Sequence, residues 1–310
     1  MIGEREIEGF RALTLSADGL EASFVPEAGM VGCSLRHRGE ELLGQRGGLA
    51  TYVAERSTMG IPLLHPWANR VSELRFSVAG REVDLDDHRE LIGLDPNGLP
   101  IHGLLAAARG WKVERHEQTS EGPVLAASFD FAAHKDLMAA FPFPHQVEIE
   151  AELTEGELRI ATKLHASGDA QVPVSFGYHP YFRLPGVERA SWEVEIPVSR
   201  RVDLDEEELP TGETESTQVE GGPLGSRTFD DEFGAPDEPF ALEGGGRRIE
   251  VFFEEGYPFA QVYAPDDDDV IALEPMTAPT NALFVGGPEL PIASPGGSYR
   301  ASFSITVGGT

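Results

Sequence analysis

The chain contains one cysteine, Cys33, among its 310 residues. A single thiol can form no intrachain disulfide and no thiolate cluster around a metal. The nine histidines include no His-Glu-x-x-His arrangement, and no glycine-rich nucleotide-binding motif or Gly-x-Ser-x-Gly motif occurs. These patterns mark zinc sites, nucleotide sites and serine nucleophiles respectively. We therefore expect no metal ion and no cofactor.

Basic residues are also scarce. Lysine and arginine total 24 against 53 aspartates and glutamates, which gives a formal net charge of −29. Such a surface repels nucleic acid and anionic membranes, so neither is an expected partner. It also disfavours polyanionic substrates unless a local basic pocket overrides the field.

Long apolar runs are missing as well. The N-terminal stretch MIGEREIEGFRALTL carries charges throughout and has no apolar core of signal-peptide length. No segment approaches the length of a transmembrane helix. The hydrophobic fraction of 40% is ordinary for a soluble globular protein, and we expect a cytoplasmic one.

Alternation of apolar and polar residues is the dominant pattern, and it predicts strands. It recurs around residues 22–24, 31–35, 147–153, 158–164, 192–198, 249–253 and 299–307. Helical periodicity is limited to residues 133–140, while 35 glycines and 23 prolines supply turns. Without a fixed repeat, this composition favours an all-β fold, a single large antiparallel β-sandwich domain spanning residues 1–310.

Two acidic segments complete this outline. Residues 201–225 are acidic and rich in glycine and threonine, which predicts a long exposed connection. The run Asp266 to Asp269 lies between apolar stretches and predicts a charged hairpin tip. A calcium loop is an alternative there, but the run lacks the glycine and the distal glutamate of an EF-hand.

His179 lies in the segment QVPVSFGYHPYFRL, residues 171–184, among aromatic residues and prolines. Prolines at this density exclude a helix and favour an extended segment that bends or ends at the histidine. An imidazole held there could transfer a proton near neutral pH. A core histidine that hydrogen-bonds to a carbonyl group is the alternative, and this segment alone leaves both open.

Glu274 follows the apolar strand Val270-Ile271-Ala272-Leu273 and precedes Pro275. A carboxylate at the end of a buried strand is unfavourable unless it has a partner. Desolvation raises its pKa and makes it a stronger base, so Glu274 is predicted to be functional.

Three further polar residues lie in apolar, proline-punctuated or acidic segments. Arg70 follows Asn69 in GIPLLHPWANRV, His102 lies in PIHG, and Asp230 lies in FDDEF. Arg70 could donate to a substrate hydroxyl or cap the surface. His102 could be structural or functional, and Asp230 alone resembles an exposed acid.

Six stretches, taken together and in order, resemble the aldose 1-epimerase (galactose mutarotase) family. They are GIPLLHPWANRV, LPIHGLL followed by Trp111, FPFPHQVEIEAEL, PVSFGYHPYFRL, FDDEF and YAPDDDDVIALEPMTAPTNAL, within residues 60–283. The resemblance implies an antiparallel β-sandwich, the galactose mutarotase-like supersandwich, with a sugar cleft on its concave face.

The resemblance also implies roles for individual residues. His179 matches the general acid of a His-x-Tyr-Phe motif, and Glu274 matches the general base of a Glu-Pro-Met-Thr motif. Arg70 and His102 match residues that contact sugar oxygens. Asp230 matches a hydroxyl ligand, although Asp231 is adjacent.

Asn69 and Tyr178, which adjoin Arg70 and His179, complete the predicted sugar-binding set. The chain has Gly177-Tyr178 before His179, where the best-known galactose mutarotases have an asparagine, so the resemblance implies no particular aldose.

The implied reaction interconverts the α- and β-anomers of a free hexose. A hexose-6-phosphate 1-epimerase on the same fold is an alternative, with Arg70, Arg75 and Arg109 as candidate phosphate ligands. A non-catalytic carbohydrate-binding module would retain the aromatic residues but has no need for His179 and Glu274 together. A glycoside hydrolase requires two carboxylates across the bond, whereas one carboxylate lies at a strand end. The sequence leaves the oligomeric state open.

Overall fold

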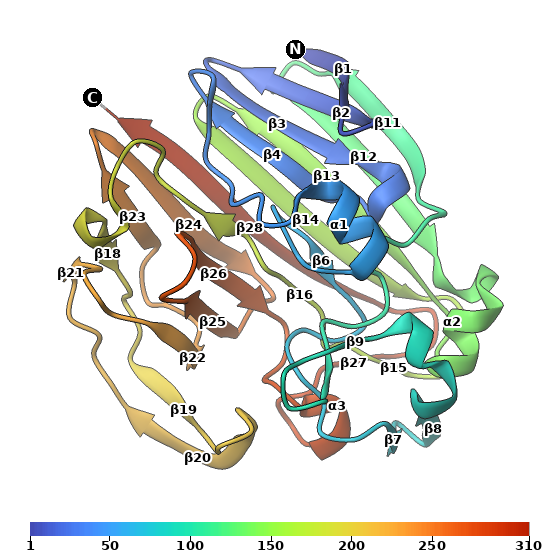
Figure 1. Ribbon diagram of the computed structural model, residues 1–310. Helices are drawn as coiled ribbons and strands as arrows, with labels where there is room; N and C mark the ends of the chain where they lie inside the picture. Colours follow the sequence, from blue (N-terminus) through green and yellow to red (C-terminus); the bar gives the residue numbers. More distant parts are fainter. Residues whose placement is uncertain (310) are drawn as a thin grey trace.

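The computed structural model describes residues 1–309 and consists of antiparallel sheets with few helices (Figure 1). The predicted all-β, antiparallel architecture is confirmed. The predicted single domain, residues 1–310, ends at Thr310, which lies outside the described residues.

One layer is a nine-stranded sheet. In spatial order its strands are β11 (Lys112–Gln118), β12 (Pro123–Asp130), β13 (His145–Thr154), β14 (Glu157–Ala166), β28 (Ser298–Gly309), β24 (Arg247–Glu255), β23 (Phe240–Gly244), β18 (Glu193–Glu195) and β21 (Gly222–Pro223).

The second layer contains two sheets. A five-stranded meander comprises β1 (Ile2–Ile7), β2 (Phe10–Ala17), β3 (Leu20–Val25), β4 (Val31–His37) and β5 (Glu40–Glu41). An eight-stranded sheet has the order β20 (Pro210–Ser216), β19 (Arg200–Leu204), β22 (Phe229–Gly234), β25 (Phe259–Ala264), β26 (Ile271–Met276), β16 (Gly177–Tyr178) and β6 (Leu63–Leu64), with β17 (Tyr181–Phe182) also paired to β26.

Contacts across the layers hold both sheets against the nine-stranded one. The His116 Nε2 atom of β11 lies 3.1 Å from the Thr14 carbonyl oxygen of β2. The rings of Tyr178 in β16 and Phe303 in β28 lie 5.1 Å apart.

Smaller elements connect the layers. They are the strand pairs β7 (Arg75–Val78) with β8 (Arg81–Asp84), β9 (Gly93–Leu94) with β10 (Pro100–Ile101) and β15 (Val172–Pro173) with β27 (Ile292–Ala293); the helices α1 (Gly48–Glu55), α2 (Lys135–Ala140) and α3 (Ala282–Val285); and the 3₁₀ turns η1 (Pro26–Ala28), η2 (Asp86–Leu91), η3 (Phe131–Ala133) and η4 (Arg189–Ser191).

The hairpin of β13 and β14 shows why alternation predicts strands correctly here. Its residues alternate between buried and partly exposed along both strands, and the pairing runs from His145–Ala166 to Thr154–Glu157. Successive side chains of a strand point to opposite faces, so one face enters the core.

Residues 201–225 are largely exposed, as predicted, but they are more than a connection, because β19 and β20 pair as a hairpin and β21 follows. Strand β20, PTGETES, is exposed along almost its whole length, so it carries no apolar period. Figure 1 shows this hairpin at the edge of the eight-stranded sheet.

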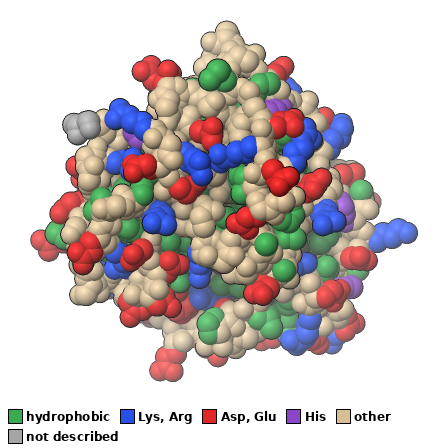
Figure 2. Space-filling view, turned by 45° about the horizontal axis from the view of Figure 1, so that its top comes forward, with side chains coloured by type: hydrophobic (Ala, Val, Ile, Leu, Met, Phe, Trp, Pro, Cys, Tyr) green, Lys and Arg blue, Asp and Glu red, His purple; other side chains and the backbone are tan. Residues whose placement is uncertain are grey.

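The acidic excess is spread over the surface. Figure 2 shows aspartates and glutamates scattered over the visible face, with lysines and arginines between them. The run Asp266 to Asp269 forms the predicted tip between β25 and β26, where Asp268 lies 3.6 Å from Arg46.

Candidate active site

Glu274 lies in β26, opposite Gln261 of the neighbouring strand β25. Only 2% of the residue is exposed. Burial, followed by the nearby Asp230 carboxylate, raises the pKa of Glu274 well above its ordinary value, and Arg70 partly offsets this. The strand therefore holds a carboxyl group that keeps its proton to higher pH than an exposed glutamate does.

His179 lies in the short gap between β16 and β17, both of which pair with β26. The close approach depends on Gly177, where a Cβ atom would lie 2.6 Å from the Pro275 carbonyl oxygen. A larger residue would therefore push the histidine segment away from β26. As a result, His179 Nε2 lies 3.2 Å from Glu274 Oε1.

This pair is buried, with His179 only 5% exposed. Burial is the main cause that lowers the pKa of His179 well below its ordinary value, and the neighbouring His102 and Arg46 lower it further. Because burial disfavours the charged form of each partner, it favours the state in which the pair holds one proton between Nε2 and Oε1 and has no net charge. A carboxyl group and an imidazole sharing one proton can exchange acid and base roles.

Arg70 and His102 come from two segments that pair with each other. The backbones of Arg70 and Ile101 form an isolated antiparallel β-bridge. The backbone N–H of His102 donates to the Asn69 carbonyl oxygen at 2.9 Å. The His102 ring meets the His179 ring edge-to-face at 5.4 Å. Burial, with Arg70 and Arg46, lowers the pKa of His102 to about 3, so this imidazole is neutral.

The Arg70 guanidinium is buried among oxygen atoms. Its Nε donates to Asp95 Oδ2 at 2.7 Å, and its Nη1 donates to Asn69 Oδ1 at 2.9 Å. Its Nη2 forms an ion pair with Glu208 and lies 3.8 Å from Asp230 Oδ2. One cation therefore meets three carboxylates.

Asp230 and Asp231 have different surroundings, which separates the two candidates. Asp230 faces Arg70 and accepts a hydrogen bond from Gln261 Nε2 at 2.6 Å. Asp231 forms an ion pair with Arg201. Burial raises the pKa of Asp230 to about 6, although Arg70 partly counteracts it. Asp230, and not Asp231, thus belongs to the cluster around Arg70.

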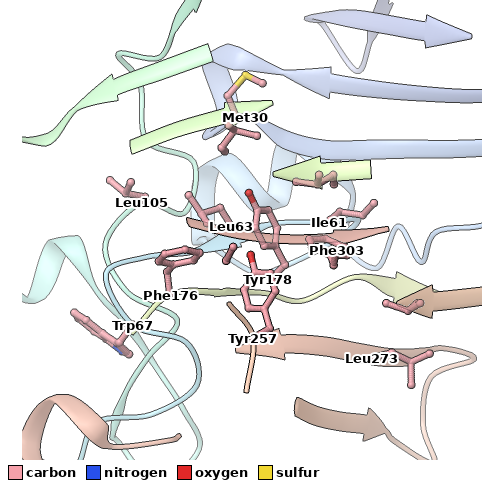
Figure 3. Close-up of a cluster of buried hydrophobic side chains, with 14 of the residues drawn as sticks. Met30, Ile61, Leu63, Trp67, Leu105, Phe176, Tyr178, Tyr257, Leu273 and Phe303 are labelled. Atoms are coloured by element: carbon pink, nitrogen blue, oxygen red, sulfur yellow. The ribbon is translucent and has the colours of Figure 1, made fainter. Parts of the chain in front are cut away.

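The predicted residues Asn69, Arg70, His102, His179, Asp230 and Glu274 are thus linked by contacts, whereas Tyr178 is directed elsewhere. The Tyr178 hydroxyl group lies 2.7 Å from Thr162 Oγ1 in the nine-stranded sheet. Figure 3 shows Tyr178 beside Phe303 among core side chains. Side-chain alternation accounts for this, because consecutive residues of an extended chain point to opposite faces.

Two tyrosines contact the His179 ring. Tyr181 stacks on it at 4.0 Å, and Tyr263 of β25 meets it edge-on at 5.8 Å. Phe176 and Phe182, the other aromatic residues of the histidine segment, are fully buried in the core. The aromatic side chains at the site therefore come partly from a strand that the sequence did not associate with His179.

Sequence reasoning missed three residues of this cluster: Asp95, Gln261 and Glu208. Gln261 gives a signal, since it is a polar residue in the apolar strand Phe259–Ala264. Asp95 gives a weaker one, because Asp-Pro-Asn-Gly predicts only a turn. Glu208 lies in an acidic run without any distinguishing neighbour.

The model of one protein family, aldose 1-epimerase, matches residues 11–306 of the chain. The chain belongs to the aldose 1-epimerase family. The resemblance inferred from the six sequence stretches is thereby confirmed.

Solved structures show the same fold. A galactose mutarotase-like protein from Clostridium acetobutylicum is 19% identical and superposes with a TM-score of 0.87, covering 100% of this chain and 99% of that one. A putative aldose 1-epimerase from Escherichia coli K12 is 22% identical, with a TM-score of 0.75 and coverages of 96% and 98%. A galactose 1-epimerase from Lactobacillus acidophilus NCFM is 15% identical, with a TM-score of 0.78 and coverages of 100% and 98%.

These identities are too low to carry a substrate from one family member to another. The search of curated proteins gave no significant match. None of the helices within residues 1–309 is long and apolar enough to cross a bilayer.

Proposed function

We propose that this aldose 1-epimerase family member is a mutarotase that interconverts the α- and β-anomers of a free hexose. His179 and Glu274 act as the acid–base pair. The observation that carries the proposal is the distance of 3.2 Å between His179 Nε2 and Glu274 Oε1 in a buried site beside Arg70.

Ring opening needs a base at the C1 hydroxyl group and an acid at the ring oxygen. Both oxygens are bonded to the same carbon, so the acid and the base must lie within a few ångströms of each other. Glu274 removes the hydroxyl proton while His179 protonates the ring oxygen. Rotation about C1–C2 presents the other face of the aldehyde, and the roles reverse on closure. Each positioned proton transfer contributes about 10²–10⁴-fold in rate.

The surrounding groups support a neutral, hydroxyl-rich substrate. Arg70 and the neutral His102 supply hydrogen-bond donors, and the Asp230 carboxylate accepts from hydroxyl groups. Within residues 1–309, the buried atoms His179 Nδ1 and Gln261 Oε1 have no hydrogen-bond partner. Buried polar groups normally have partners, so these atoms mark where sugar hydroxyl groups can bind.

Tyr263, which is partly exposed, supplies aromatic surface at the site, and the buried Tyr181 packs on the His179 ring behind it. The C–H face of a pyranose packs on aromatic rings, and the two tyrosines also limit the access of water to His179. Exclusion of water strengthens the electrostatic interactions of the acid–base pair.

The test follows the optical rotation of freshly dissolved α-D-glucose and α-D-galactose with enzyme and EDTA. We expect at least one sugar to equilibrate faster than in buffer alone. If neither does, but calorimetry detects sugar binding, the protein is a carbohydrate-binding module. If only 6-phosphate sugars equilibrate faster, it is a hexose-6-phosphate 1-epimerase.

A further inference from the structure

The tip of the β19–β20 hairpin holds Glu208 in a defined position. The N–H groups of Glu207 and Leu209 donate to Asp205 Oδ1 at 2.9 and 3.0 Å. Leu209 is buried, which anchors the tip against the protein. Glu208 itself has a φ of +61°, an uncommon backbone conformation for a residue with a side chain. The hydrogen bonds and the buried Leu209 therefore fix the backbone from which the Glu208 side chain extends.

The Glu208 carboxylate reaches into the candidate active site. It forms an ion pair with Arg70 Nη2, next to Asp230. Arg70 Nε also donates a hydrogen bond of 2.7 Å to Asp95 Oδ2. Arg70 already faces two carboxylates, Asp95 and Asp230, so the third carboxylate makes the net charge around this guanidinium more negative.

Two of the three arginines that are candidate phosphate ligands, Arg75 and Arg109, lie away from the active site. Arg75 is exposed and forms ion pairs with Asp84, Asp86 and Asp87. Arg109 lines a separate surface hollow together with Lys135. Arg70 is thus the one of these three arginines that faces Asp230.

We propose that Glu208 is a specificity-determining residue that makes the cleft select uncharged aldoses and reject sugar phosphates. This rests on the proposed function, since it refines the substrate of the same site. A sugar hydroxyl group can donate to Glu208 or Asp230 and accept from Arg70. A phosphate dianion facing the hairpin instead meets two carboxylates, and such like-charge contacts discriminate between otherwise similar ligands.

The experiment compares kcat/KM for mutarotation of glucose and glucose 6-phosphate in the wild type, Glu208→Gln and Glu207→Gln. Glu207 is the matched control, because it is exposed at the same tip and its replacement removes the same charge. We expect the wild type to prefer glucose. Glu208→Gln should raise the glucose 6-phosphate to glucose ratio at least about tenfold, which corresponds to about 1.4 kcal/mol, while Glu207→Gln leaves the ratio unchanged.

Three results would overturn the proposal. They are equal or better use of glucose 6-phosphate by the wild type, an unchanged ratio in Glu208→Gln, and equal changes in both variants, which would reflect overall charge alone. Circular dichroism checks that both variants are folded.

A binding measurement separates this proposal from the proposed function. Calorimetric titration of glucose and glucose 6-phosphate requires no turnover. If the wild type binds glucose without catalysing mutarotation, the proposed function fails, and the affinity ratio of the same three proteins still tests Glu208. A wild type that binds neither glucose nor glucose 6-phosphate would overturn the proposal for Glu208, while the galactose arm of the optical-rotation assay still tests the proposed function.

Discussion

Two buried histidines within residues 1–309, His65 and His179, each approach a different kind of partner through Nε2. His65 Nε2 lies 2.7 Å from His145 Nε2, and His179 Nε2 lies 3.2 Å from Glu274 Oε1. All four residues are almost inaccessible to solvent. Distance and burial therefore do not distinguish the pairs, whereas the neighbouring groups do.

The His65–His145 pair is enclosed by aromatic rings. Phe131 stacks on His145 at 4.3 Å, and His145 Nδ1 lies 2.6 Å from the Phe143 carbonyl oxygen. Burial lowers the pKa of His145 to about 4 and that of His65 well below its ordinary value, so both rings are neutral. Two neutral imidazoles in an apolar enclosure have no carboxylate with which to exchange a proton, which indicates a structural role.

The His179–Glu274 pair combines two chemically different groups beside Arg70, His102 and Asp230. Under the proposed function its proton can pass to a substrate oxygen, because a carboxyl group and an imidazole each have an acid and a base form. The comparison teaches that the partner, and not burial, decides whether a core histidine is suited to catalysis.

The largest expected effect separates the two pairs by activity. Glu274→Gln should reduce kcat by about 10²–10⁴-fold, because the amide keeps the shape but takes no proton. His179→Asn should act likewise, while calorimetry should show retained sugar binding in both variants. A near-wild-type kcat in either variant would remove that residue from the mechanism.

The next effect separates the pairs by acid stability. The folded pKa of His145 is about 4, below its ordinary 6.5, so between these values the unfolded chain binds more protons. Stability therefore falls as the pH drops from about 6.5 to about 4, and His145 accounts for up to about 3 kcal/mol of the loss.

The measurement is urea unfolding at several pH values for the wild type and His145→Phe. The variant should lose less stability on acidification. The raised pKa values of Glu274 and Asp230 act in the opposite direction but cancel in the difference between the two proteins. Parallel pH dependences would mean that His145 does not carry this linkage.

At about pH 8 the same variant should be less stable than the wild type by about 1–3 kcal/mol, because His65 loses its buried hydrogen-bond partner. We expect kcat to remain unchanged, since no proton of the reaction passes through His145. Thermal denaturation and the optical-rotation assay measure the two quantities. A large fall in kcat with a retained Tm would contradict the structural role.

The smallest expected effect concerns the pH profile of kcat/KM. The pair is active with one proton and no net charge, while gaining or losing a proton leaves a buried charge. Desolvation therefore moves the acidic limb of the bell-shaped pH profile to lower pH and the basic limb to higher pH. Both limbs should lie outside the interval between the ordinary pKa values of glutamate, 4.5, and histidine, 6.5. Because burial raises the pKa of Glu274 and lowers that of His179, Glu274→Asp should shift the basic limb most. Rates from about pH 4 to about pH 10 that show a narrow peak within that interval would argue against a shared proton.

The sequence predicts much of this molecule where one face of a strand is buried. The β13–β14 hairpin and the buried strand that carries Glu274 follow from local pattern. The predicted position of Glu274 at the end of that strand is wrong, because β26 continues through it to Met276. The β19–β20 hairpin does not, because both of its faces are largely polar. A strand whose two faces are equally exposed has no alternation of apolar and polar residues, so its sequence does not predict it.

Within the site, the residue types of His179, Glu274 and Arg70 could be singled out one at a time. Their partners could not, because Gln261 and Asp95 meet Asp230 and Arg70 only through tertiary structure. Tyr178 is included in the predicted site because it precedes His179 in the sequence. Adjacent residues of an extended chain point to opposite faces, so its side chain lies in the core beside Thr162. Spatial neighbours across strands are not encoded in the order of one segment.

The contact between Glu208 and Arg70 also bears on the working concentration of substrate. Under the proposed function, a sugar that accepts a hydrogen bond from Arg70 shares the guanidinium with the tethered Glu208 carboxylate, which is present at a high effective concentration. The apparent affinity then falls in proportion to the fraction of molecules in which Arg70 is available. A mutarotase with this contact is expected to respond in proportion to its sugar over a wide range and to saturate only when that sugar is abundant.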